Sequence, residues 1–98
     1  MIVLFTDFGL EGPYTGQVYA RLLQQAPAVP VVNLFSDLAA FDVQAAAYLL
    51  PSYSSGFPPG TVFLCVVDPG VGGERPAVIL KANDSWYVGP NEGLFALV

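Results

Sequence analysis

Apolar residues recur along the chain in short blocks, and the spacing within each block predicts its conformation. Residues 2–6, 30–35 and 61–67 are short apolar runs, the pattern of strands that are buried on both faces of a sheet. Residues 13–26 place apolar side chains at helical spacing between two of these runs. Residues 51–60 contain three prolines, three serines and two glycines, so we expect a loop there.

The remaining blocks predict a second helix and a hairpin. Asp42 is a suitable N-cap for a helix that starts at Val43 and continues through an alanine-rich stretch to Leu50. Strands are expected at 77–82 and 85–88, because these apolar segments flank the turn-forming pair Asn83-Asp84. Strands that alternate with helices form βαβ units, which favour a parallel sheet. The predicted fold class is α/β: a partial three-layer sandwich with a mostly parallel, Rossmann-like sheet.

Composition supports one compact unit and indicates that it belongs to something larger. The chain has 98 residues, of which 54% are hydrophobic and 11% charged, so intrinsic disorder is excluded. Residues 93–98 form an apolar run without a following helix or polar tail. One interpretation is a small domain that ends in a hydrophobic strand. The other, which we favour, is that residues 1–98 are the N-terminal part of a longer protein.

Charge and cysteine content exclude several functional classes. Three basic residues stand against eight acidic ones, a net charge of −5 that argues against binding to nucleic acid. No apolar run is long enough for a membrane span, and the N-terminus has no basic segment typical of a signal peptide. Cys65 is the only cysteine, which rules out an intramolecular disulfide and suits the reducing cytoplasm. With no histidine either, the usual zinc ligand sets are absent, and no metal is expected.

Three segments are expected at the carboxyl edge of the predicted sheet, where open α/β sheets bind ligands. They are Thr6 to Gly9, Asn33 to Ser36, and Asp68 to Arg75. Asp7 and Asp68 each follow a buried strand almost directly. These two strands could be neighbours, and two such carboxylates on neighbouring strands favour a site. An aspartate in this position is also a common turn cap.

The segment from Asp68 to Arg75 is the most informative of the three. It holds three glycines within four residues, so its backbone could approach a ligand closely. It lacks the Gly-Lys-Ser/Thr of a P-loop and the spacing of a dinucleotide fingerprint. Arg75 could fold back onto Asp68, or pair on the surface with Glu74 or Asp84.

Most other distinctive side chains are expected in the core. Helical spacing makes a core position the default for Tyr14, Tyr19 and Tyr48, and Trp86 lies in a predicted strand. Cys65 sits mid-strand between apolar neighbours and is expected to be buried and inert. Phe41 stands just before the helix cap and could flank a ligand ring.

These motifs, taken in order, resemble one family. Thr6-Asp7-Phe8-Gly9 is followed by Phe41-Asp42-Val43 and by Val66-Val67-Asp68-Pro69-Gly70-Val71-Gly72 with Arg75. The chain thereby resembles the N-terminal part of the S-adenosyl-L-methionine (SAM) hydroxide adenosyltransferases, or SAM hydrolases. These are relatives of the fluorinase and chlorinase enzymes. The resemblance covers essentially all 98 residues.

The resemblance implies attack by water or hydroxide at the ribose C5′ of SAM, which yields adenosine and methionine without a cofactor. It implies that Asp7 holds the ribose hydroxyls and that Phe41 lies against the nucleoside. Asp68 and Arg75 would belong to an Asp–Arg–His set that positions the attacking water. The histidine and a second domain are expected beyond position 98, so this chain alone is expected to be inactive. The implied assembly of the parent is a homotrimer with active sites at the subunit interfaces.

Two other functions stay open at this point. Gly12, Asn33, Ser36 and Asn91-Glu92 depart from the family pattern, which would suit a non-catalytic nucleoside-binding remnant or an interaction module. A metal-dependent phosphohydrolase could use Asp7 and Asp68 as Mg²⁺ ligands, although such a site usually has more clustered acids. A rise in melting temperature with SAM or with Mg²⁺ would distinguish these functions.

Overall fold

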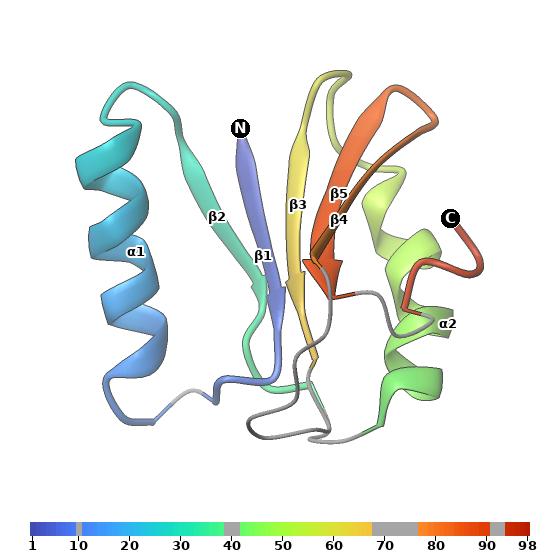
Figure 1. The fold of residues 1–98 in the computed structure, drawn as a ribbon, viewed down its shortest axis with the longest axis horizontal. Coiled ribbons are helices and arrows are strands. Elements are labelled where there is room, and N and C mark those ends of the chain that lie inside the picture. Colours follow the sequence, from blue (N-terminus) through green and yellow to red (C-terminus); the bar gives the residue numbers. More distant parts are fainter. Residues whose placement is uncertain (10, 39–41, 68–76, 91–93) are drawn as a thin grey trace.

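The fold is seen in a computed structural model, which describes residues 1–9, 11–38, 42–67, 77–90 and 94–98 (Figure 1). Two helices and five strands alternate along the chain in the order that the sequence predicts. They are β1 (Ile2–Thr6), α1 (Tyr14–Gln25), β2 (Val31–Phe35), α2 (Val43–Ser54), β3 (Val62–Val66), β4 (Ala77–Ala82) and β5 (Ser85–Pro90). None of the helices in these ranges is long and apolar enough to cross a membrane.

The strands form one sheet in the order β2-β1-β3-β5-β4. β1 is parallel to both β2 and β3, β3 is parallel to β5, and only β4 and β5 are antiparallel. The prediction of a mostly parallel α/β sheet is therefore confirmed. From β1 the chain passes to β2 on one side, and from β2 it crosses to β3 on the other side of β1. The order in which strands are added to the sheet therefore changes direction between β1 and β3. Such a switch point is where open α/β sheets bind ligands, beyond the carboxyl ends of the strands.

The two helices lie on opposite sides of the sheet, so the described chain has three layers (Figure 1). This arrangement follows from the topology, since two right-handed crossovers that run in opposite directions across a sheet put their helices on opposite faces. The two helices contribute unequally to the core. α2 has four buried residues, and α1 has none.

The core lies between α2 and the face of the sheet that it covers. On this face, β1 contributes Val3 and Phe5, and β3 contributes Phe63 and Cys65. All four side chains are fully buried. Tyr87 of β5 stacks on Phe63 with ring centroids 5.1 Å apart. Aromatic contacts of this kind add to the free energy gained from burying apolar surface.

Local signals in the sequence set two element boundaries correctly. The side chain of Asp42 caps α2, because its Oδ1 accepts a hydrogen bond of 2.9 Å from the backbone N–H of Ala45. Asn83 and Asp84 both have positive φ, at 52° and 65°, as the tight turn between β4 and β5 requires. The predicted cap and the predicted hairpin are both confirmed.

The prediction of a loop over 51–60 is wrong at its start. α2 continues through Pro51 and ends at Ser54. Proline lacks the N–H that would bond to the carbonyl of Ala47, and it usually ends or bends a helix. Here Leu50 and Ser54 are buried on either side of Pro51, so packing against the sheet favours one more helical turn.

The expected core positions of several aromatic residues are also wrong. Tyr14 and Tyr48 are exposed, and Trp86 retains 40% of its accessible surface. Trp86 points away from the α2 face because it alternates with the buried Ser85 and Tyr87 along β5. Its ring instead lies under the Lys81 ammonium of β4, 5.4 Å from the ring centroid, a cation–π contact at the surface.

Candidate functional site at the carboxyl edge of the sheet

Asp7 lies at the switch point of the sheet. It directly follows β1, and its backbone N–H donates a 3.1 Å hydrogen bond to the carbonyl of Val66 at the end of β3. The ends of β1 and β3 are thus held together, with Thr6 opposite Val66 in the parallel ladder. Asp7 itself is half-buried. These backbone contacts place the Cα atom of Asp7 at the edge where a ligand is expected.

The loop after β2 supports the segment that carries Asp7. The backbone N–H of Gly9 bonds to the carbonyl of Ser36, and the N–H of Leu38 bonds to the carbonyl of Thr6. Ser36 is almost completely buried, and its hydroxyl donates a 2.6 Å hydrogen bond to Oδ1 of Asn33. The segment from Asn33 to Ser36 was expected at this edge, and the structure brings it there as a brace for the backbone around Asp7.

The start of α1 forms the other border of the site. The Thr15 hydroxyl donates to the carbonyl of Gly9, which ties the first turn of α1 to the loop after β1. Gly9 has a φ of +95°, so glycine suits this turn. The rings of Phe8 and Tyr14 lie 6.3 Å apart, and Tyr14 keeps 66% of its surface exposed. The exposed tyrosine is therefore beside the site rather than in the core.

Three predicted site residues lie outside the described residues: Phe41, Asp68 and Arg75. The described range that contains β3 stops at Val67, one residue before Asp68, and Val67 is fully buried directly after the strand. Because Asp7 bonds to Val66, the strand that leads to Asp68 is the neighbour of the strand that leads to Asp7. The two strands that precede Asp7 and Asp68 could be neighbours according to the sequence, and β1 and β3 are indeed paired.

Cys65 takes no part in this edge. It is fully buried in the middle of β3, and burial raises the pKa of its thiol well above the ordinary value. A thiol held in its protonated form is a poor nucleophile and a poor metal ligand. The prediction of a buried, inert cysteine is consistent with this position.

The fold and this edge define an α/β protein with a candidate ligand site at the carboxyl ends of β1 and β3. Residues 2–98 match the N-terminal domain of the SAM hydroxide adenosyltransferases, and the chain belongs to that family. A relative named (R)-S-adenosyl-L-methionine hydrolase, from Thermus thermophilus, is 46% identical over 98% of this chain and 37% of its own length. A relative of the same name from Methanocaldococcus jannaschii is 32% identical over 100% of this chain and 39% of its own length.

Solved structures agree with the fold. An uncharacterised conserved protein from Thermotoga maritima superposes with a TM-score of 0.94 at 36% identity, over 100% of this chain and 38% of that one. A conserved hypothetical protein from Thermus thermophilus superposes with a TM-score of 0.86 at 45% identity, over 98% of this chain and 40% of that one. The chain thus spans less than half of the length of each relative and structure to which it is similar.

Proposed function

We propose that residues 1–98 are the N-terminal part of the N-terminal domain of an enzyme that hydrolyses SAM to adenosine and L-methionine. The observation that carries this proposal is the position of Asp7 at the carboxyl edge between β1 and β3. It occurs in a chain that is 46% identical to a protein named as a SAM hydrolase. The proposed substrate would bind at the carboxyl edge of the sheet, where the carboxylate of the half-buried Asp7 is available to contact it.

In the proposed reaction the oxygen of water forms a bond to C5′ of the ribose while the C5′–S bond breaks. The electron pair of that bond goes to sulfur, so methionine leaves as a neutral thioether, and the water gives up one proton. The barrier falls when the water is held in line with the breaking bond. No cofactor is proposed, because water is the only co-reactant.

We assign the roles of individual residues by family resemblance. Asp7 accepts hydrogen bonds from the ribose hydroxyls, and Phe41 lies against the nucleoside. Asp68 holds the water in line and accepts its proton, and Arg75 stabilises the hydroxide-like charge that develops on the water oxygen. The net charge of −5 is compatible with a substrate whose sulfonium is positive.

The decisive experiment measures adenosine release by a longer protein that carries these residues. Asp68→Asn and Arg75→Ala should each lower kcat by about a hundredfold or more, as expected for groups that act on the reacting water. Asp7→Asn should mainly raise KM. Asp37→Asn is the matched control, since Asp37 follows β2 at the same edge but is exposed. Turnover that is unchanged in both the Asp68 and the Arg75 variants would refute their roles.

The 98-residue chain allows a second test, by melting temperature. A ligand that binds only the folded state stabilises it by mass action. SAM or adenosine is expected to raise the melting temperature of the chain, and the rise should shrink in Asp7→Asn. An equal rise with Mg²⁺ alone would instead favour a metal-dependent phosphohydrolase. Binding of adenosine by this chain, together with a longer protein that releases none from SAM, would favour a nucleoside-binding remnant.

We further propose that the whole protein is a cytoplasmic homotrimer with active sites at its subunit interfaces. A single buried cysteine is compatible with a reducing compartment. Sedimentation of the longer protein tests the assembly, and a monomer with full activity would refute the shared site.

A further inference from the structure

β2, the edge strand beside β1 (Figure 1), contains one residue more than a regular ladder requires. Leu4 pairs with Asn33 but Phe5 pairs with Phe35, so Leu34 is an extra residue. Successive side chains of a regular strand point to opposite faces, yet Leu34 and Phe35 both pack against the core between the sheet and α2. This is the arrangement of a β-bulge, which bends a strand and often occurs next to a functional site.

Side-chain contacts hold the bulge in place. The Ser36 hydroxyl donates a 2.6 Å hydrogen bond to Oδ1 of Asn33, so this bond spans the extra residue. Ser36 is 1% exposed, whereas Asn33 is exposed. The ring of Phe35 contacts two other rings edge-on, that of Phe5 at 5.5 Å and that of Tyr53 in α2 at 5.2 Å. The end of β2 is therefore held by a side-chain hydrogen bond and by ring contacts to β1 and α2.

The bulge sets the position of the loop that follows β2. In that loop the carbonyl of Ser36 accepts a hydrogen bond from the N–H of Gly9, and the N–H of Leu38 donates to the carbonyl of Thr6 over 3.2 Å. These hydrogen bonds lie on either side of Asp7 in the sequence. One strand residue spans ~3.3 Å, so a ladder without the extra residue would carry Ser36 and Leu38 out of hydrogen-bond range.

We propose that Asn33 and Ser36 are positioning residues for the Asp7 carboxylate. Their hydrogen bond holds the bulge, the bulge sets the loop after β2, and the loop fixes the backbone that carries Asp7. This inference rests on the proposed function, in which Asp7 contacts the ribose hydroxyls, and it identifies what determines the affinity of that contact. Neither residue needs to touch the substrate, because Ser36 is buried and its hydroxyl proton is donated to Asn33.

Amide hydrogen exchange of the 98-residue chain tests the first step. Ser36→Ala removes the hydroxyl and should speed exchange of the Gly9 amide about fivefold, the effect of one neutral hydrogen bond. Thr61→Val is the matched control, because the Thr61 hydroxyl is equally buried and also donates over 2.6 Å, to the carbonyl of Pro58. Thr61 precedes β3 at the amino edge, so Thr61→Val should lower stability to a similar degree while Gly9 exchange changes by less than about twofold. Asn33→Ala, at an exposed position, gives the same reading should Ser36→Ala disturb the fold.

Steady-state kinetics of the longer protein test the second step. Asn33→Ala and Ser36→Ala should each raise KM for SAM about fivefold and leave kcat within about twofold, because the residues that act on the water are untouched. Asn33→Asp keeps the Oδ1 acceptor and should restore KM. Thr61→Val should leave both constants unchanged, which distinguishes a loss of position from a general loss of stability.

The outcomes separate this inference from the proposed function. Gly9 exchange no faster in Ser36→Ala than in Thr61→Val, or KM unchanged in both Ser36→Ala and Asn33→Ala, would overturn the positioning role. A longer protein that releases no adenosine from SAM, even without substitutions, would refute the proposed function instead. The exchange rates would then still decide whether Asn33 and Ser36 hold the segment that carries Asp7.

Discussion

Gly89 offers the sharpest test of the sheet, because no side chain fits at that position. It lies in β5, next to β3, and a Cβ built on it would be 2.1 Å from the backbone oxygen of Cys65 and 3.1 Å from the ring of Phe95. Real Cβ contacts are essentially never under 3.0 Å, so the Gly89→Ala variant must move β5 about 0.9 Å from β3. Overpacking costs typically ~1–3 kcal/mol, and the loss of one strand hydrogen bond adds about 1 kcal/mol. We expect Gly89→Ala to lower the free energy of unfolding by about 3 kcal/mol.

The assay is thermal unfolding followed by circular dichroism, with a second glycine as control. For a domain of this size, 3 kcal/mol corresponds to a fall in Tm of about 12–24 °C. Gly16 lies exposed in α1, and a Cβ there would meet no atom within 4 Å. Gly16→Ala should therefore raise stability by ~0.5–1 kcal/mol, because alanine is the better helix former. The reasoning is refuted if Gly89→Ala melts within about 2 °C of the unmodified chain, less than ~0.5 kcal/mol on this scale.

Three further predictions concern single side chains. Burial raises the pKa of the Cys65 thiol, so above pH ~8.5 the unfolded chain loses a proton that the folded chain keeps. The free energy of unfolding should therefore fall by up to ~1.4 kcal/mol per pH unit in urea titrations between about pH 8.5 and 9.5, and Cys65→Ala should remove this slope. Asp42→Ala should cost about 1 kcal/mol in the same assay and Asp42→Asn much less, since asparagine can still accept from Ala45; equal losses would contradict the cap. Tyr87→Phe removes the buried hydrogen bond to Ser54 and should cost ~1–3 kcal/mol, whereas an unchanged midpoint would show that the bond contributes nothing.

The sequence was sufficient where a local or periodic signal decides the structure. The apolar runs of β1 and β3 reveal buried strands, and Asn83-Asp84 sits between two apolar segments at the spacing of a hairpin. It was insufficient where contacts distant in sequence decide. Pro51 is a local signal for the end of a helix, yet Leu50 and Ser54 hold one more turn against the sheet. The contact of Ser54 with Tyr87 exists only once β5 has paired with β3.

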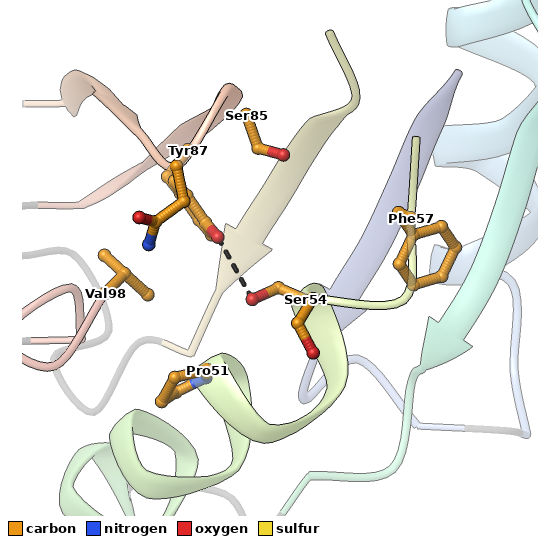
Figure 2. Close-up of a pocket in the computed structure, with 8 residues that line it drawn as sticks. Pro51, Ser54, Phe57, Ser85, Tyr87 and Val98 are labelled. Atoms are coloured by element: carbon orange, nitrogen blue, oxygen red, sulfur yellow. Dashed lines mark hydrogen bonds between the residues drawn. The ribbon is translucent and has the colours of Figure 1, made fainter. Parts of the chain in front are cut away.

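The candidate site divides in the same way. The position of Asp7 could be predicted, because an aspartate directly after a buried strand must lie at the carboxyl edge of a parallel sheet. The hydrogen bond from the N–H of Gly9 to the carbonyl of Ser36 could not be predicted, because it depends on where the loop after β2 returns to β1. A pocket at the amino edge of the sheet, lined among others by Ser54, Ser85 and Tyr87, also escaped sequence reasoning (Figure 2). The only signal was the alternation of Ser85, Trp86 and Tyr87, which puts the serine and the tyrosine on the same face of β5.

The two edges of the sheet are built from different parts of the chain, so a substitution at one edge should leave the other edge unchanged. Asp7 is positioned by backbone hydrogen bonds to β3 and to the loop after β2, none of which involves α2 or the β4–β5 turn. The pocket at the amino edge depends instead on the end of α2 and on Tyr87, whose ring stacks on Phe63 in the core. Ser85→Ala should therefore leave ligand binding at the Asp7 edge unchanged, which a titration of the chain with adenosine can check, whereas Asp7→Asn should weaken it. Gly89→Ala should lower the stability of the chain, but it acts on the pair of β3 and β5 and not on the pair of β1 and β3 that carries Asp7.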